Sequence, residues 1–238
     1  DHNLFNNRAT AAFRKRASIF ADGKTTAYRL LNGEGDRCPG FVIDRYADTA
    51  VLRLDGDAVA SRAEDLTRGL RDALGAIGIT SLILRGRKKE AELIFGKMPE
   101  KAISVREHGV PFYADVKDGQ KTGAFLDQRE NRARVGEFVR ERPIGKRRVL
   151  NLFSYAGGFS LHAALAGAHV TSVDIAAQAH ATAQKSFQLA GLSSKDHTWA
   201  TADAFLFLTE AEKKRERWDI VICDPPSFAP NEKAKARA

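Results

Sequence analysis

Cysteine is scarce in this sequence, and its scarcity argues against two common ways of stabilising a fold. Only Cys38 and Cys223 occur, and neither belongs to a CxxC motif or to a Cys/His cluster with metal-ligand spacing. We therefore expect neither a disulfide framework nor a zinc site, and no bound metal. A reducing compartment, the cytoplasm, fits this composition best.

The sequence also lacks a long apolar run. No stretch approaches the roughly 20 apolar residues that a membrane-spanning helix needs. The amino end, DHNLFNNRATAAFRKR, has no apolar core of a signal peptide. We expect a protein that neither spans nor enters a membrane, and the composition leaves open whether it is a monomer or a homodimer.

Acidic residues are outnumbered, with 30 Asp and Glu against 38 Lys and Arg and a net charge of +8. Such a balance favours a polyanionic partner or substrate over an acidic one, although many basic proteins bind no nucleic acid. Two segments, RGRKKE and RARVGEFVRERPIGKRR, concentrate the positive charge and are expected to contact phosphate, although a solvated helix face or loop explains either one alone. Their basic residues are Arg85, Arg87, Lys88, Lys89, Arg132, Arg134, Arg140, Arg142, Lys146, Arg147 and Arg148.

The first half of the chain has the pattern of a small α+β domain. Residues 1–24 are basic and polar, and we expect a basic amino-terminal arm there. Residues 25–116 contain strand-like runs, among them FVIDRY and SLILRG, on both sides of a stretch with helical apolar spacing. This order of strand, strand, helix, strand, strand indicates a small α+β domain that ends near residue 116.

Residues 117–238 follow a different rhythm. Apolar strands alternate with helices, as in VLNL, LHAALAGA and VTSVD, which is typical of a parallel α/β sheet with right-handed crossovers. We expect a Rossmann-like domain. Because the pattern stops after its fourth strand, we also expect the carboxyl-terminal part of this domain to be missing from the sequence.

Polar motifs follow four strands of this domain. A glycine turn with Gly157 and Gly158 follows the first, and Asp174, Asp203 and DPPSF follow the others. In a doubly wound sheet, ligands bind beyond these carboxyl ends. The turn is not GxGxxG, which disfavours a nicotinamide enzyme. A tight turn or helix N-caps explain each motif alone, but their accumulation favours a nucleotide-type site.

A further motif, KTGAFLDQRENR, occupies residues 121–132. Its polar residues surround Phe125 and Leu126, which is too polar for a core element. The simpler interpretation is the start of a helix, with Thr122 or Asp127 as its N-cap. The alternative interpretation is part of a binding site.

Together, KTGAFLDQRENR, VLNLFSYAGGFSLHAALAGAHVTSVD and DIVICDPPSF resemble the class I S-adenosylmethionine-dependent methyltransferases that modify bases of large-subunit ribosomal RNA. The closest resemblance is to the RlmI-like, cytosine-C5 branch, and NGEGDRCPGFVIDRY extends it into the first domain. Members usually begin with a small RNA-binding PUA domain. The resemblance therefore implies that residues 1–24 follow such a domain.

The resemblance implies S-adenosylmethionine as cofactor, 23S rRNA as partner, and a role for each motif. The glycine turn would border the methionine part of the cofactor, Asp174 the ribose and Asp203 the adenine. DPPSF would hold the target base, while the front of the pocket would be closed by the 121–132 motif. The implied cofactor residues are Lys121, Thr122, Gln128, Arg129, Phe153, Ser154, Tyr155, Gly157, Gly158, Asp174 and Asp203, and the implied catalytic residues are Asp224, Pro225, Pro226 and Phe228.

The chemistry leaves two reactions open. Carbon 5 of cytosine is a poor nucleophile and needs a thiolate at carbon 6 to activate it. The family carries that cysteine well after DPPSF, and we interpret Cys223 as a core thiol because it ends an apolar strand. Methylation of a guanine amino group needs no cysteine and is the alternative. A non-catalytic RNA-binding or ribosome-assembly module is the alternative of another class.

Overall fold

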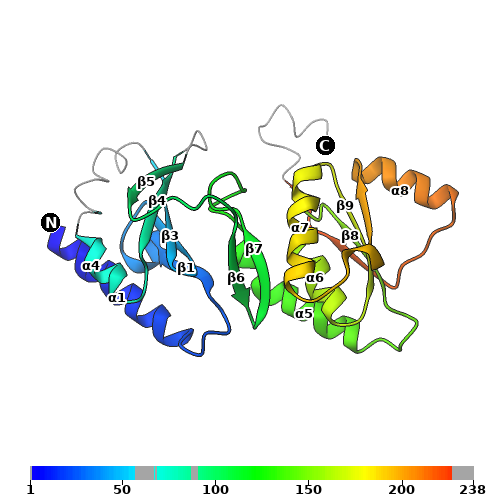
Figure 1. Ribbon diagram of the computed structural model, residues 1–238, viewed down its shortest axis with the longest axis horizontal. Helices are drawn as coiled ribbons and strands as arrows, with labels where there is room; N and C mark the ends of the chain where they lie inside the picture. Colours follow the sequence, from blue (N-terminus) through cyan, green and yellow to red (C-terminus); the bar gives the residue numbers. More distant parts are fainter. Residues whose placement is uncertain (1, 57–66, 68, 87–90, 227–238) are drawn as a thin grey trace. The chain divides into compact units, whose positions relative to one another are not determined.

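The computed structural model describes residues 2–56, 67, 69–86 and 91–226 of the chain. It divides into two compact units, Asp1–Arg129 and Glu130–Ala238 (Figure 1). We expected the boundary between residues 116 and 117. It lies later because residues 116–126 pack on the sheet of the first unit, through Val116, Ala124 and Leu126.

The first unit is built on a sheet whose described strands run in the order β1-β2-β3-β4-β5. Neighbouring strands are antiparallel except for β3 and β4, which are parallel and between which α4 lies in the sequence. A separate hairpin, β6 and β7, follows. The elements are β1 Ala27–Asn32, η1 Gly33–Asp36, β2 Phe41–Tyr46, β3 Thr49–Leu54, α4 Leu70–Gly75, β4 Ser81–Arg85, β5 Ala91–Phe95, β6 Ile103–Glu107, β7 Val110–Ala114 and η2 Leu126–Gln128. The expected order of strands therefore gains one strand before the helix and a hairpin after the sheet.

The amino-terminal residues do not form the arm that we expected. They form α1, His2–Ile19, which packs on α4 and β1. Phe5, Ala9 and Phe13 recur at helical spacing and are buried in the same core as the sheet. The basic composition hid this helix, because its apolar stripe is narrow and the rest of its surface is polar.

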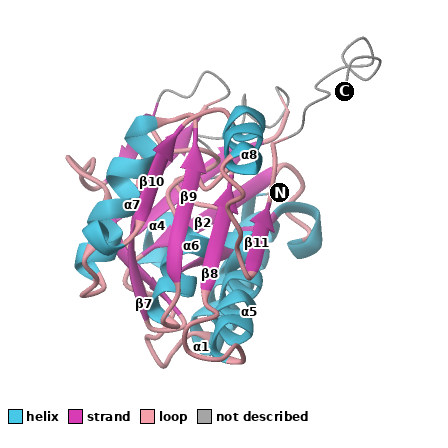
Figure 2. Cartoon of the chain, turned by 90° about the vertical axis from the view of Figure 1, so that its right-hand side faces the viewer, coloured by secondary structure: helices cyan, strands magenta, loops and turns pink. Residues whose placement is uncertain are grey.

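The second unit is an α/β sheet with the strand order β10-β9-β8-β11 among the described strands, all parallel (Figure 2). Helices α6 and α7 lie on one face and α8 on the other (Figure 1). This confirms the Rossmann-like expectation. The elements are α5 Arg129–Arg140, β8 Arg148–Leu152, α6 Gly158–Leu165, β9 His169–Asp174, α7 Ala177–Leu189, η3 Ser194–Asp196, β10 Thr198–Thr201, α8 Ala204–Lys213 and β11 Ile220–Cys223.

Helix α8 was absent from our reading of the sequence. It begins at Asp203, whose carboxylate caps it, and its apolar face contributes Ala204 and Phe207 to the core around Leu152 and Val173. The chain runs from β8 outward to β9 and β10 and then returns to the other side of β8 as β11. The order of strands thus reverses beside β8, and ligands of such sheets bind at the carboxyl edge near that point.

Candidate functional site

The strand register brings the predicted site residues of the second unit to one edge of the sheet. Thr201 pairs with Asp174, Val173 with Leu152, and Leu152 with Cys223. The turn after β8, Asp174, Asp203 and Asp224 therefore all follow strand ends at the same edge. Parallel pairing is the physical cause, because it aligns the carboxyl ends of all four strands.

Asp174 holds the turn that follows β8. Its Oδ2 accepts a hydrogen bond from the backbone N–H of Tyr155 at 2.7 Å, and its Oδ1 accepts one from Ala176 N–H at 2.9 Å. The carboxylate is half-buried. Each carboxylate oxygen can accept about two hydrogen bonds, so Asp174 can fix the turn and still accept the hydroxyls of a ribose.

The turn after β8 has a backbone conformation that side chains rarely adopt. Phe153 and Tyr155 have φ values of 57° and 46°, and Gly157 has a φ of 72°. Non-glycine residues in the left-handed region are uncommon and concentrate at functional sites. The turn is thus held in an unfavourable conformation by its surroundings, among them Asp174.

The two glycines of the turn serve packing within the unit. A Cβ at Gly157 would lie 2.7 Å from the Cβ of Ala183 in α7, and one at Gly158 would lie 2.8 Å from Cδ of Arg132. Both contacts are too close for a side chain. The glycines therefore let α7 and Arg132 approach the turn, a reason that our sequence interpretation, close approach to a ligand, did not include.

Ser154 is buried and turned into the protein. Its hydroxyl contacts Nε2 of His180 at 3.3 Å, and Nδ1 of the same ring contacts Oγ1 of Thr201 at 3.3 Å. His180 thus ties the turn after β8 to the end of β10. Sequence reasoning assigned no role to His180, and the pattern around it offered no signal, because the partners lie on distant segments.

Asp203 acts as the N-cap of α8. Its Oδ1 accepts hydrogen bonds from the backbone N–H groups of Phe205 at 2.9 Å and Leu206 at 3.1 Å. The capping interpretation is therefore correct for one carboxylate oxygen. The side chain is exposed at the same edge as Asp174, so the cap does not remove it from the candidate site.

Two apolar side chains beside the strand-end acids were missed from the sequence. Ile175, directly after Asp174, is 76% exposed, and Phe205, two residues after Asp203, is 61% exposed. The ring of Phe205 meets the ring of Phe153 edge-on at a centroid distance of 6.4 Å. A large apolar residue one or two positions after a strand-end acid was the available signal.

The DPPSF motif is described as far as Pro226. Asp224, Pro225 and Pro226 are exposed directly after β11, and Phe228 lies outside the described residues. Cys223 is exposed as well, which corrects our interpretation of it as a core thiol. The reason is the position of β11 at the edge of the described sheet, where Val221, two residues earlier on the same face, is 56% exposed.

The remaining predicted cofactor residues belong to the first unit. Lys121 is exposed, and its Nζ lies 2.9 and 3.0 Å from the two carboxylate oxygens of Asp127 and 4.3 Å from the ring centre of Phe125. Gln128 ends η2. The guanidinium of Arg129 lies over the ring of Phe20. Thr122, by contrast, is 1% exposed, and its hydroxyl is engaged within the first unit.

Comparison with known proteins identifies the family. Residues 61–234 match the model of the family described as S-adenosylmethionine-dependent methyltransferase. The chain belongs to the S-adenosylmethionine-dependent methyltransferase family. A ribosomal RNA large subunit methyltransferase of Deinococcus radiodurans is 40% identical to it over 94% of this chain and 57% of the relative. Ribosomal RNA large subunit methyltransferase I of Shewanella amazonensis is 35% identical over 97% of this chain and 59% of the relative.

Solved structures of the same family share the fold. A SAM-dependent methyltransferase from Streptococcus mutans superposes with a TM-score of 0.87 at 29% identity, over 96% of this chain and 59% of the other. A methyltransferase solved in complex with SAH gives a TM-score of 0.87 at 30% identity, over 98% of this chain and 60% of the other. The chain thus spans less than two thirds of the length of these relatives.

Several basic residues that we expected to contact RNA have structural roles instead. Arg147 donates hydrogen bonds to the carbonyl oxygens of Arg140, Arg142 and Ala166, near the ends of α5 and α6. Arg85 is 4% exposed and Arg132 is 6% exposed. Arg87, Lys88 and Lys89 lie outside the described residues. Arginine near a helix carboxyl terminus satisfies the last carbonyl groups, which explains Arg147.

The described residues were compared with the requirements of a membrane-spanning helix and of a metal site, and they meet neither. No helix in the described part of the chain is both long and apolar enough to cross a bilayer. Within residues 2–226, apart from the stretches that the structure does not describe, no three His, Cys, Asp or Glu side chains are grouped to hold a metal ion.

The buried position of His180 leads us to expect that the stability of the folded protein depends on pH. Burial lowers the pKa of His180, and the charge of Asp174 only partly offsets this. The unfolded chain, with an ordinary histidine pKa of about 6.5, therefore binds more protons than the folded chain below that pH. We expect the urea midpoint to fall as the pH is lowered from 7 to 5, and to fall less in His180→Gln. Equal pH slopes for the two proteins would contradict this assignment.

Proposed function

We propose that this protein transfers a methyl group from S-adenosylmethionine to a base of large-subunit ribosomal RNA. The observation that carries the proposal is the arrangement around Asp174, whose carboxylate fixes the strained turn after β8 at the carboxyl edge of a sheet with the family's fold. The names of the relatives support ribosomal RNA as the substrate. Such a substrate would be met in the cytoplasm.

We assign the cofactor to the carboxyl edge of β8, β9 and β10. The backbone of the turn formed by Phe153 to Gly158 would border its methionine part, Asp174 would accept the ribose hydroxyls, and Asp203 would accept the adenine amino group. Ile175 and Phe205 would add exposed apolar surface for the adenine ring. From the first unit, Lys121, Gln128 and Arg129 remain candidates for contact with cofactor or substrate.

The target base would be held by Asp224 and the two prolines after it. For carbon 5 of cytosine, a thiolate adds to carbon 6, carbon 5 takes the methyl group, and loss of the carbon-5 proton expels the thiolate. Asp224 would hold the ring at N3 during these steps. The DPPSF motif and the RlmI-like resemblance favour this reaction.

Methylation of a guanine amino group is the second candidate. The amino nitrogen takes the methyl group and then loses a proton, while Asp224 and the carbonyl oxygen of Pro225 accept its N–H groups. The exposed Asp224 and Pro225 after β11 suit this role equally well. Both reactions require the base to leave its stack.

Two measurements test the proposal. Isothermal titration calorimetry with SAH should show binding to the protein, and the absence of binding by folded protein would refute the cofactor assignment. Mass spectrometry of large-subunit ribosomal RNA from cells that lack the gene should show the loss of one modification. Loss of a 5-methylcytosine supports the first reaction, whereas loss of an N2-methylguanine supports the second.

A further inference from the structure

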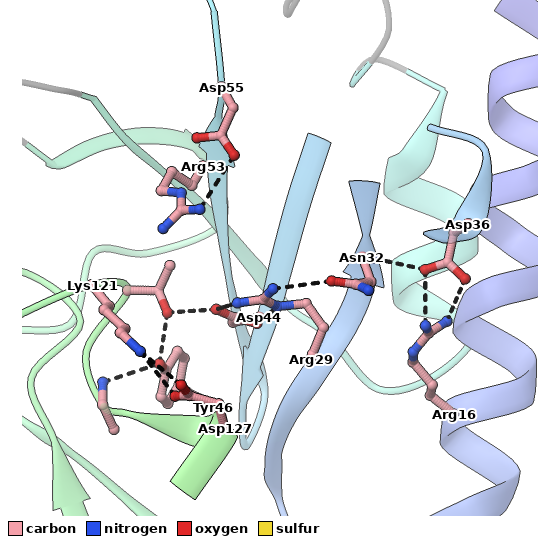
Figure 3. Close-up of polar contacts among 12 residues, drawn as sticks. Arg16, Arg29, Asn32, Asp36, Asp44, Tyr46, Arg53, Asp55, Lys121 and Asp127 are labelled. Atoms are coloured by element: carbon pink, nitrogen blue, oxygen red, sulfur yellow. Dashed lines mark hydrogen bonds and ion pairs between the residues drawn. The ribbon is translucent and has the colours of Figure 1, made fainter. Parts of the chain in front are cut away.

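Buried polar networks occur in both units, and the one in the second unit lies beside the candidate cofactor site. In the first unit, the side chains of Asp44, Tyr46 and Thr122 contact one another (Figure 3). These contacts stay within that unit. In the second unit, the network is centred on His180 and includes the turn after β8, which borders the cofactor in the proposed complex.

The turn after β8 is attached to its surroundings at two consecutive residues. Asp174 accepts a hydrogen bond from Tyr155 N–H, and the carbonyl oxygen of Val173 accepts one from Ser154 N–H at 3.0 Å. The buried hydroxyl of Ser154 is a third point of attachment, because it lies 3.3 Å from Nε2 of His180. Tyr155 has a φ of 46°, and a backbone in this region persists only where its surroundings hold it.

The ring of His180 links this turn to the end of β10. Its Nδ1 lies 3.3 Å from Oγ1 of Thr201, the last residue of that strand. Strand β9 lies between β8 and β10 in the sheet, so the ring connects the ends of two strands that are not neighbours. A neutral imidazole has one donor and one acceptor nitrogen, and a hydroxyl can donate or accept. The neutral ring therefore satisfies both hydroxyls, whichever nitrogen carries the proton.

The packing of α7 explains why this ring reaches the turn. His180 and Ala183 are three residues apart and therefore share a face of the helix. A Cβ at Gly157 would lie 2.7 Å from the Cβ of Ala183, so the helix and the turn are in close contact. The ring of His180 also meets the ring of Trp199 edge-on at a centroid distance of 5.6 Å. The ring is thus held between α7, β10 and the turn.

We infer that His180 is a positioning residue for the methyl-transfer reaction, which holds the turn formed by Phe153 to Gly158 in the conformation that receives the methionine part of the cofactor. The inference rests on the proposed function. It also gives Ser154 a different role from the one implied by the resemblance, since its hydroxyl supports the turn from inside. His180 is buried and is assigned no contact with the reacting atoms.

His180→Leu tests the inference, and His197→Leu is its matched control. The two histidine rings lie at the ends of one row of edge-on ring contacts, with Trp199 and Phe187 between them. His197 also has a hydrogen-bond partner, Val170 N–H at 3.2 Å, but this contact lies near the amino end of β9. Each variant removes one ring and one set of polar contacts, so the urea midpoints of the two variants should fall by similar amounts.

Only the change at His180 should affect the turn and the cofactor. We expect His180→Leu to bind SAH about tenfold more weakly, because Ser154 loses its partner, and His197→Leu to stay within about twofold of the unsubstituted protein. Hydrogen exchange at the Tyr155 amide should become about tenfold faster in His180→Leu alone. His180→Gln, whose amide can replace Nε2, should restore SAH affinity to within about threefold. A glutamine variant no better than the leucine variant contradicts the inference.

A double-mutant cycle tests whether Ser154 acts through His180. Ser154→Ala alone should weaken SAH binding by about tenfold, and its addition to His180→Leu should weaken binding by less than about twofold more. Additive losses would indicate that Ser154 contacts the cofactor directly, and they would contradict the inference.

The outcomes separate this inference from the proposed function. If the unsubstituted protein binds SAH and the two leucine variants bind it equally well, the positioning role is overturned and the proposed function stands. If the folded, unsubstituted protein does not bind SAH, the proposed function is overturned and the positioning role with it. If His180→Leu does not fold, Ser154→Ala provides the same measurement, and an unchanged exchange rate at the Tyr155 amide contradicts the inference.

Discussion

Replacement of Asp174 by alanine is expected to weaken SAH binding by about 100-fold or more. The carboxylate accepts backbone hydrogen bonds from Tyr155 and Ala176, and in the proposed complex it also accepts ribose hydroxyls. Hydrogen bonds to a charged group contribute about 1.5–3 kcal/mol each, and 1.4 kcal/mol corresponds to a tenfold change in affinity. Calorimetry at one ionic strength measures the change.

Asp219→Ala is the matched control for this variant. Asp219 also accepts a backbone hydrogen bond, from Arg148 N–H at 2.8 Å, but it lies at the amino end of the strands. The Asp219→Ala variant should bind SAH with the same affinity as the unsubstituted protein. Asp174→Asn should bind SAH more weakly than the unsubstituted protein, because it loses the charge and one acceptor. An unchanged affinity in folded Asp174→Ala would remove Asp174 from the cofactor site.

Replacement of Asp224 by alanine is expected to lower the rate of methyl transfer by about 100- to 1,000-fold, the usual contribution of a side chain that takes part in proton transfer or charge stabilisation at the reacting group. The side chain is exposed after β11, so its loss should change the stability of the fold little. SAH affinity should stay within about twofold, because Asp224 is assigned to the base. Transfer of radiolabelled methyl groups to ribosomal RNA measures the rate.

The Cys223→Ala variant tests whether Asp224 or the adjacent Cys223 is needed for methyl transfer. The thiol is exposed beside Asp224, and exposure alone is compatible with a nucleophile. Our assignment predicts that Cys223→Ala keeps its activity while Asp224→Ala loses it, and the opposite result would identify Cys223 as the nucleophile. If Asp224→Ala also restores every function of the gene in cells, the protein acts as an RNA-binding or assembly module.

The fold of the second unit was predictable because its signals are local. VLNL and VTSVD are short apolar runs bounded by turns, and the helices between them have helical spacing. Helix α8 was not predicted, although a helix N-cap at Asp203 was weighed, because the accumulation of strand-end motifs favoured a ligand-binding role for this acid. The same carboxylate caps the helix. A strand-end acid followed by AFLFL is also the signature of a capped helix.

The first unit was harder to predict because its decisive contacts are long-range. The sequence of helix α1 suggests a basic arm. Only the structure shows that Phe5 and Phe13 are buried in the core beside the sheet. Arg85 stands in a basic run that suggested phosphate contact, yet its guanidinium is buried against Val116 and Gly119. Burial of an arginine depends on carbonyl groups some 30 residues away, so no local pattern reports it.

The order of its motifs alone indicated the family of this protein, its parallel sheet and the acids that follow three of the four described strands, because strand ends, turns and apolar spacing depend on neighbouring residues. The tertiary structure alone decided which of those polar groups are already engaged. It turned Ser154 and Thr122 inward, gave Asp174 two backbone partners, and exposed Cys223. The burial and the hydrogen-bond partners of a side chain depend on segments that are far apart in the sequence. They can therefore be determined only from the folded structure.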